Sequence, residues 1–250
     1  MKNNSKIIGR IPVSLDKRKL KVCGMKYLEN IQQIGALLPD YLGFIFYEKS
    51  KRNFEGMIPE LPKFIKKVGV FVDEYVDIVA SLVKEYDLQV VQLHGNESVD
   101  YIENLKILCQ SERIDESEQL EIIKVFSVGE TFNFDELTPF EEVVDYFLFD
   151  TKGKERGGNG VTFNWQLLGK CSSTKPYFLS GGIGLEELDN LLLFLQSKES
   201  THCIAIDVNS KFEIEAGLKS VDKISKFKRL LVEGLKADSI QSQLAVKKQK

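Results

Sequence analysis

The sequence predicts a single α/β domain built as a closed barrel of eight parallel strands. Short apolar runs and amphipathic segments alternate through most of the 250 residues and make eight strand–helix units. Several runs are apolar throughout, which is typical of strands buried on both faces of a parallel sheet. Eight such units in roughly 230 residues favour a (β/α)8 TIM barrel, whereas an open doubly wound sheet, the alternative, usually has about five or six.

Each strand is expected where a short apolar run stops at a turn. These runs lie at residues 20–23, 41–46, 68–71, 90–93, 121–126, 146–149, 177–179 and 203–206. The intervening helices are recognised by apolar residues at helical spacing, as in Val76, Val79, Ala80 and Val83. They are expected at residues 28–37, 59–65, 75–86, 99–109, 135–143, 163–168, 185–194 and 221–231.

The barrel is expected to occupy residues 19–235. Residues 1–18 are interpreted as an N-terminal extension, residues 236–250 as a polar C-terminal tail, and residues 111–119 as a charged insertion before the fifth strand. The first residues lack the apolar core of a signal peptide. Since no apolar run reaches the ~18 residues of a membrane span, we expect a cytoplasmic protein with no membrane partner.

The composition argues against several classes of function. Hydrophobic residues make up 43% of the chain, enough for a sizeable core, and the formal net charge of −3 argues against a bulk affinity for nucleic acid. The four cysteines form no CxxC pair, and with only two histidines the Cys/His spacing of a zinc site is absent. We therefore expect four reduced thiols and no metal.

Two residues at strand ends are the candidates for chemistry. Cys23 ends the first apolar run, just before Gly24, and Asp150 ends the sixth, just before Thr151. The carboxyl ends of parallel strands meet at one face of a barrel, so the thiol and the carboxyl group are expected to share that face. There they could flank one substrate and transfer protons.

Glycine-rich turns after neighbouring strands indicate a phosphate site. Gly181 and Gly182 follow the seventh strand, and Asn209 or Ser210 could open a short helix after the eighth. Glycines let backbone amides approach an anion closely, and barrels often bind phosphate after strands seven and eight. A further cluster after the sixth strand, which contains Gly158 and Gly160, could also reach the phosphate or could be a plain flexible connection.

These motifs resemble the phosphoribosylanthranilate isomerase family of tryptophan biosynthesis over about residues 20–228. The combination of KVCGM with VVQLHG is the most specific part of the resemblance. The other matching pieces lie at residues 43–46, 50–52, 68–72, 149–151, 157–160, 180–182 and 207–210.

The resemblance implies a reaction and a role for each residue. The family converts N-(5-phosphoribosyl)anthranilate to its 1-deoxyribulose 5-phosphate isomer, an Amadori rearrangement that needs no cofactor. By resemblance, Asp150 is the general acid that protonates the ring oxygen, and Cys23 is the general base that takes the proton from ribose C2. Arg52 would pair with the anthranilate carboxylate, while His94 and Asp207 would line the substrate. A small-molecule substrate is thus the expected partner, with a monomer as the default.

The chemistry sets requirements on the two protonation states. Cys23 must ionise more readily than a free thiol, whose pKa is roughly 8.5. Asp150 must hold a proton, which calls for a pKa raised by burial or by a nearby negative charge. Strand-end amides and a basic side chain would favour the Cys23 thiolate, whereas a nearby phosphate would oppose it.

The chain departs from the family pattern in two loops. Asn159 and Val161 stand where the family usually has threonine and lysine, and Lys211 and Phe212 replace glycine and valine in the eighth loop. A phosphate-binding barrel without catalytic activity is therefore kept as an alternative, and the lysine could itself bind phosphate. An indoleglycerol-phosphate synthase is the third hypothesis, but the lysine and glutamate set that it needs at several strand ends is not found.

Overall fold

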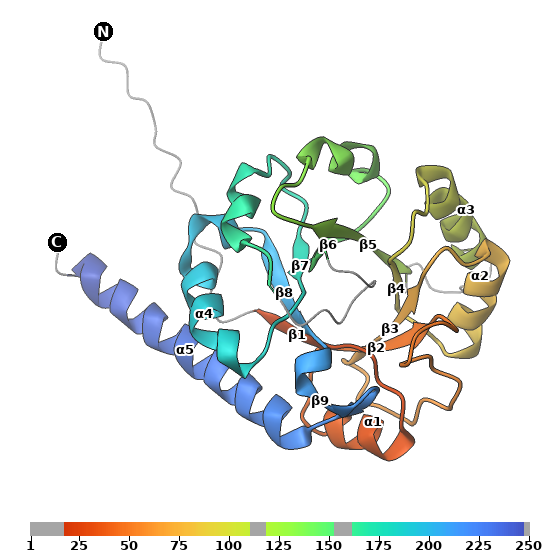
Figure 1. The fold of residues 1–250 in the computed structure, drawn as a ribbon, viewed down its shortest axis with the longest axis horizontal. Helices are drawn as coiled ribbons and strands as arrows, with labels where there is room; N and C mark the ends of the chain where they lie inside the picture. The colour runs from red at the N-terminus through yellow and green to blue at the C-terminus, as the bar shows by residue number, and fades with distance from the viewer. Residues whose placement is uncertain (1–17, 111–118, 153–161, 248–250) are drawn as a thin grey trace, which may run out of the picture.

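The computed structural model describes residues 18–110, 119–152 and 162–247. Its centre is a closed all-parallel barrel in which neighbours in sequence are neighbours in space, and β1 pairs with β8 to close it (Figure 1). The strands are β1 (Lys19–Val22), β2 (Tyr41–Phe46), β3 (Lys66–Phe71), β4 (Val90–Leu93), β5 (Glu121–Val128), β6 (Tyr146–Thr151), β7 (Tyr177–Leu179) and β8 (Cys203–Val208). The predicted barrel is confirmed, and the open sheet is wrong because no edge is left between β1 and β8.

Helices and short helical turns surround the barrel in the described part of the chain (Figure 1). The α-helices are α1 (Leu28–Gly35), α2 (Val76–Glu85), α3 (Val99–Gln110), α4 (Leu188–Gln196) and α5 (Val221–Lys247). The 3-10 turns are η3 (Phe134–Phe140), η4 (Trp165–Lys170), η5 (Leu185–Glu187), η6 (Lys198–Ser200) and η7 (Ser210–Phe212). A small antiparallel pair, β9 (Glu213–Glu215) and β10 (Leu218–Lys219), follows η7. Among these elements, none combines the length and apolar character that a membrane crossing requires.

Five helix predictions need correction. Residues 59–65 form no helix, because Leu61 precedes Pro62 and a residue before proline is disfavoured in the helical region. The helices expected at 135–143 and 163–168 are 3-10 turns, the first with Pro139 inside it. The helix expected at 185–194 also begins as the 3-10 turn η5. The last helix does not stop at residue 231 but continues to Lys247, through residues that we assigned to the tail.

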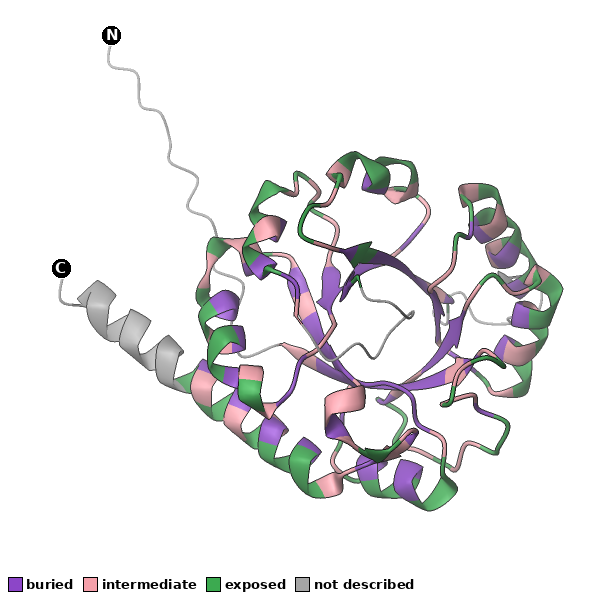
Figure 2. Cartoon of the chain, in the orientation of Figure 1, coloured by how far each residue is buried: buried purple, intermediate pink, exposed green. Residues whose placement is uncertain are grey.

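The barrel interior is an apolar plug topped by polar side chains. Tyr41 and Phe178 meet edge to face there, with ring centroids 5.2 Å apart. The plug consists of Tyr41, Val68, Val90, Ile123, Val125, Leu148, Phe178 and Ala205, and Figure 2 shows the strands around it as almost entirely buried. Because side chains on a strand alternate between faces, the residue two positions further along points to the same side. Leu148 is thus followed by Asp150, and Ala205 by Asp207, at the carboxyl-end rim.

The plug predicts a large cost for truncating its central ring. Phe178 is fully buried, so Phe178→Ala should lower the free energy of unfolding by about 3–5 kcal/mol through lost burial and a residual cavity. Urea unfolding followed by circular dichroism measures this. Leu193→Ala, which truncates a side chain of α4 that is 65% exposed, should change it by less than about 0.5 kcal/mol. Equal effects of the two substitutions would contradict the proposed packing.

Candidate functional site

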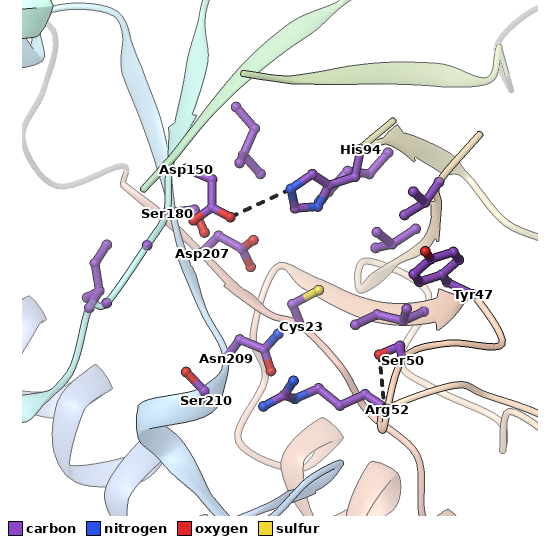
Figure 3. Close-up of a pocket in the computed structure, with 18 of the residues that line it drawn as sticks. Cys23, Tyr47, Ser50, Arg52, His94, Asp150, Ser180, Asp207, Asn209 and Ser210 are labelled. Atoms are coloured by element: carbon purple, nitrogen blue, oxygen red, sulfur yellow. Dashed lines mark hydrogen bonds and ion pairs between the residues drawn. The ribbon is translucent and has the colours of Figure 1, made fainter. Parts of the chain in front are cut away.

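A cavity opens at the carboxyl-end rim of the barrel. Both candidate catalytic residues line it, and Figure 3 shows their side chains entering the same space from different strands. Its polar lining consists of Cys23, Tyr47, Ser50, Arg52, Gln92, His94, Asp150, Ser180, Asp207, Asn209, Ser210 and Lys211. The predicted juxtaposition of the thiol and the carboxyl group at one rim is therefore present.

Cys23 is placed by the closure of the barrel. It follows β1 directly, and its N–H donates to the carbonyl of Val208 on β8 over 2.9 Å. Gly43 on β2 makes room for the sulfur, since a Cβ at that position would lie only 2.8 Å from Sγ. The side chain is buried at the cavity floor, with 4% of the residue exposed.

Asp150 lies within β6 and has the protonation behaviour expected of a general acid. Burial raises its pKa to about 6, and the neighbouring Asp207 carboxylate acts in the same direction. Its Oδ1 accepts a hydrogen bond from the N–H of Thr151 over 2.9 Å. His94 Nε2 lies 3.7 Å from Asp150 Oδ2, close enough for an ion pair when the imidazole is protonated.

Lys21 carries a buried charge beneath the same cavity, against two residues that line it, Gln92 and Asp207. Its Nζ donates to Asp207 Oδ2 over 2.9 Å and to Gln92 Oε1 over 2.8 Å. Lys21 and Asp207 are partners in the β1–β8 register. Burial alone lowers the pKa of Lys21, but the attraction of Asp207 and Cys23 outweighs it and leaves the pKa above its ordinary value.

The expectation that the Cys23 pKa lies below that of a free thiol is wrong for this structure. Burial raises the pKa of Cys23, and Asp207 acts in the same direction. Lys21 and, more weakly, Lys219 oppose this by favouring the thiolate. Charge stabilisation is therefore present at the thiol, as the chemistry requires, but in this structure it does not overcome the cost of burial.

Arg52 is fixed by a carboxylate of the protein. Its Nε and Nη2 donate to the two oxygens of Glu213 over 2.8 and 2.7 Å, the fork geometry that suits a guanidinium. Lys219 Nζ donates to Glu213 Oε1 over 2.7 Å and to Asn209 Oδ1 over 2.6 Å. Burial raises the pKa of Glu213, but hydrogen bonds from Arg52 and Lys219 outweigh it and bring that pKa to about 2.

The glycine turn after β7 and the loop after β8 border one side of the cavity. Gly181 and Gly182 both have positive φ, of 92° and 67°, a conformation that favours glycine. Asn209 precedes η7, which begins at Ser210, so the short helix that we expected is present. The other two predicted phosphate contacts, Gly158 and Gly160, fall outside the described residues, as do Asn159 and Val161.

The two departures in the eighth loop have different surroundings. Phe212 is fully buried against Phe227 of α5, with ring centroids 5.0 Å apart, and so belongs to the core. Lys211 lines the cavity and forms an ion pair with Glu186 of η5 over 2.7 Å. Because Phe212 packs in the core, it gives no support to the alternative of a barrel without catalytic activity.

Sequence reasoning missed several polar and charged residues at and beneath the rim. Lys21, Gln92, Ser180, Glu213 and Lys219 were not singled out as site residues. A signal was available for the first, because a lysine between Leu20 and Val22 in a strand buried on both faces requires a buried partner. Among the described residues, no group of three or more His, Cys, Asp or Glu side chains could hold a metal ion.

The fold and the cavity define an enzyme-like (β/α)8 barrel with a thiol and a protonatable carboxyl group at one rim. The family model of N-(5'phosphoribosyl)anthranilate (PRA) isomerase matches residues 20–229. The chain therefore belongs to the N-(5'-phosphoribosyl)anthranilate isomerase family.

Individual relatives agree with this assignment. The N-(5'-phosphoribosyl)anthranilate isomerase of Parabacteroides distasonis is 37% identical over 214 residues, which is 83% of this chain and 90% of the relative. The crystal structure of phosphoribosyl anthranilate isomerase from Thermotoga maritima has a TM-score of 0.67 at 28% identity and covers 88% of this chain and 99% of its own. A second solved isomerase, in complex with reduced 1-(o-carboxyphenylamino)-1-deoxyribulose 5-phosphate, has a TM-score of 0.63 at 26% identity, with 88% and 99% coverage.

The raised pKa of Asp150 predicts a pH-dependent cost in stability. Its folded-state pKa of about 6 lies above the ordinary 3.8, so between these values the folded protein binds more protons than the unfolded chain, and stability falls as pH rises. Asp150→Asn cannot ionise and should exceed the wild type in unfolding free energy by about 2–3 kcal/mol at pH 7. The difference should shrink as the pH is lowered to 4. Urea titrations at several pH values measure it, and parallel curves for the two proteins would contradict the prediction.

Proposed function

We propose that the protein converts N-(5-phosphoribosyl)anthranilate to 1-(2-carboxyphenylamino)-1-deoxyribulose 5-phosphate in tryptophan biosynthesis, with Asp150 as general acid and Cys23 as general base. The observation that carries the proposal is the meeting of these two side chains in one cavity of a barrel that belongs to this family. Proton transfer by two positioned groups is what an aldose–ketose isomerisation requires.

The chemistry can be followed atom by atom. Asp150 gives its proton to the ring oxygen as the bond between that oxygen and C1 breaks, and the lone pair of the anthranilate nitrogen forms a C=N bond. Cys23, as thiolate, then takes the proton from C2, which yields an enol-amine. This intermediate gains a proton at C1 and loses one from the O2 hydroxyl to become the ketose, so the reaction is balanced without an oxidant or reductant.

The two anionic ends of the substrate would bind different groups of residues that line the cavity. Gly181, Gly182, Asn209 and Ser210 border one side and would receive the phosphate. Arg52 lies below Cys23 in Figure 3 and would attract the anthranilate carboxylate.

His94 and Asp207 would line the middle of the substrate. The Oδ1 atom of Asp207 is buried and has no hydrogen-bond partner within the described part of the chain. A buried acceptor without a donor is costly, and a ribose hydroxyl at this position would satisfy it.

We further propose that the protein acts as a cytoplasmic monomer. The four cysteines are all free thiols, which is typical of a reducing compartment. A family structure from Thermotoga maritima concerns monomers generated from a dimeric isomerase, so oligomeric state varies between family proteins or variants. Light scattering on the purified protein measures the state of this one, and a mass of twice 28.5 kDa would overturn the monomer.

Loss of either catalytic group should abolish most turnover. Cys23→Ala and Asp150→Asn should each lower kcat at least ~100-fold, because general acid–base catalysis by a positioned group contributes about 10²–10⁴-fold. Consumption of phosphoribosylanthranilate, followed by fluorescence, measures the rate. Two matched controls are Cys171→Ala, half-buried at the end of η4, and Asp145→Asn, at the other end of β6. Both controls should retain activity, and near-wild-type turnover in either catalytic variant would remove that residue from its role.

Lys211 and Glu186 should affect substrate affinity in opposite directions. We expect the Lys211 ammonium to add attraction for the substrate phosphate, against the competition of Glu186. Lys211→Met should raise KM about two- to fivefold and Glu186→Gln should lower it, which is the range of a solvent-screened charge pair. Glu187→Gln is the control, because Glu187 instead accepts from Asn190. A KM unchanged in both variants, measured by the same assay at low salt, would exclude Lys211 from phosphate binding.

A further inference from the structure

Lys21 is the most deeply buried charge at the site, and the mechanism above does not use it. The residue is fully buried, so its ammonium group makes its contacts entirely within the protein. Two of its three N–H donors go to Gln92 on β4 and Asp207 on β8, at 2.8 and 2.9 Å. Its positive charge favours the thiolate form of Cys23. Lys21 and Cys23 are two positions apart at the end of β1, so their side chains point to the same side of the strand.

Stability alone is a poor explanation for a charge in this position. Taking an ammonium and a carboxylate out of water costs several kcal/mol for each ion, and well-packed apolar residues often replace such pairs without loss. The rest of the barrel interior shows this solution, because the plug below is built from apolar and aromatic side chains. A role in the chemistry above the plug accounts for the exception.

The charges around the two reacting groups are distributed unequally. Cys23 is influenced by Lys21, Lys219 and Asp207, that is, by two cations and one anion. Among its neighbours, Asp150 is influenced most strongly by the charge of Asp207 and more weakly by that of Lys21; it also accepts a hydrogen bond from the Thr151 N–H, and His94 lies at 3.7 Å. Positive charge therefore lies nearest the group that must lose a proton, and negative charge nearest the group that must keep one.

We propose that Lys21 is a positioning residue for the acid–base pair: its charge favours the thiolate of Cys23 against the cost of burial, and its ion pair favours the ionised form of Asp207, which helps to keep Asp150 protonated. This inference rests on the proposed function only for its consequence in catalysis. The electrostatic part concerns the thiol itself and can be measured without substrate.

The test is the pH dependence of Cys23 alkylation. The rate of modification by iodoacetamide, read at the Cys23 peptide by mass spectrometry, follows the thiolate fraction. Lys21→Met should move the midpoint upward by about one pH unit or more, since a nearby opposite charge is worth about 1–3 units. Asp207→Asn should move it downward, because the remaining ammonium then has the thiolate as its principal anionic partner. Shifts of opposite sign are not expected from a merely structural role.

The chain offers a matched control in a second buried ion pair. Lys124 is 4% exposed and donates to Glu97 over 2.8 Å, so Lys124→Met also removes one buried ammonium. Lys124 does not line the catalytic cavity and should leave the Cys23 midpoint unchanged. A midpoint shift in Lys124→Met equal to that in Lys21→Met would overturn the proposal, as would an unchanged midpoint in Lys21→Met.

Kinetics then connect the electrostatics to catalysis. At pH 7, Lys21→Met should lower kcat about tenfold or more with a smaller change in KM, and part of the loss should be recovered as the pH is raised. If Lys21→Met does not fold, as judged by circular dichroism, Lys21→Gln takes its place. If that also fails, Asp207→Asn decides, and the absence of its downward shift overturns the proposal. Full activity of Cys23→Ala would instead refute the proposed base and leave the alkylation result standing.

Discussion

The ion pair between Lys21 and Asp207 lies where the first and last strands close the barrel. Closure brings together two residues that are 186 positions apart in the sequence, and it places one positive and one negative charge beneath the cavity. Cys23 is two residues beyond Lys21 on the same side of the strand, and therefore lies close to this ion pair. Asp150 enters from β6 and is influenced by the carboxylate. The reactivity of both groups therefore depends on how this one pair is held.

Burial raises the pKa of both reacting groups, which helps one of them to do its task and hinders the other. It raises the pKa of Asp150 to about 6, which leaves roughly one molecule in ten protonated at pH 7 where an exposed aspartate would have almost none. It also raises the pKa of Cys23, which makes the thiolate scarcer. A dry site therefore favours the acid and disfavours the base, and only a nearby cation can separate the two effects. Lys21 supplies that cation at the cost of its own desolvation.

The elements that could be predicted are those set by local pattern. Apolar runs located every strand of the barrel but not the small β9–β10 hairpin, and the bounds of β4 and β7 were predicted to the residue. Others extend beyond their runs, as β6 does through Asp150 and Thr151, because ladder pairing with a neighbour continues past the last apolar residue. The helix at 59–65 failed because apolar spacing gave no weight to Pro62. The partner of Lys21 could not be predicted, since the β1–β8 register depends on closure of the whole barrel.

A second ion network, formed by Arg52, Glu213 and Lys219, holds two loops together at the rim of the cavity. Arg52 comes from the loop after β2, whereas Glu213 and Lys219 belong to the small hairpin after η7, so their contacts join two loops that are remote in sequence. With a pKa of about 2, Glu213 remains ionised throughout the physiological range, and it holds the Nε–Nη2 edge of the guanidinium in place. A substrate carboxylate then meets an arginine whose orientation is already set, so little side-chain entropy is lost on binding.

The contact between Arg52 and Glu213 also limits the affinity for the substrate, because Glu213 is a negative charge beside the position that the substrate carboxylate must occupy. Lys219, at 1% exposure, offsets that charge from behind, and the arginine can therefore be both rigid and attractive to an anion.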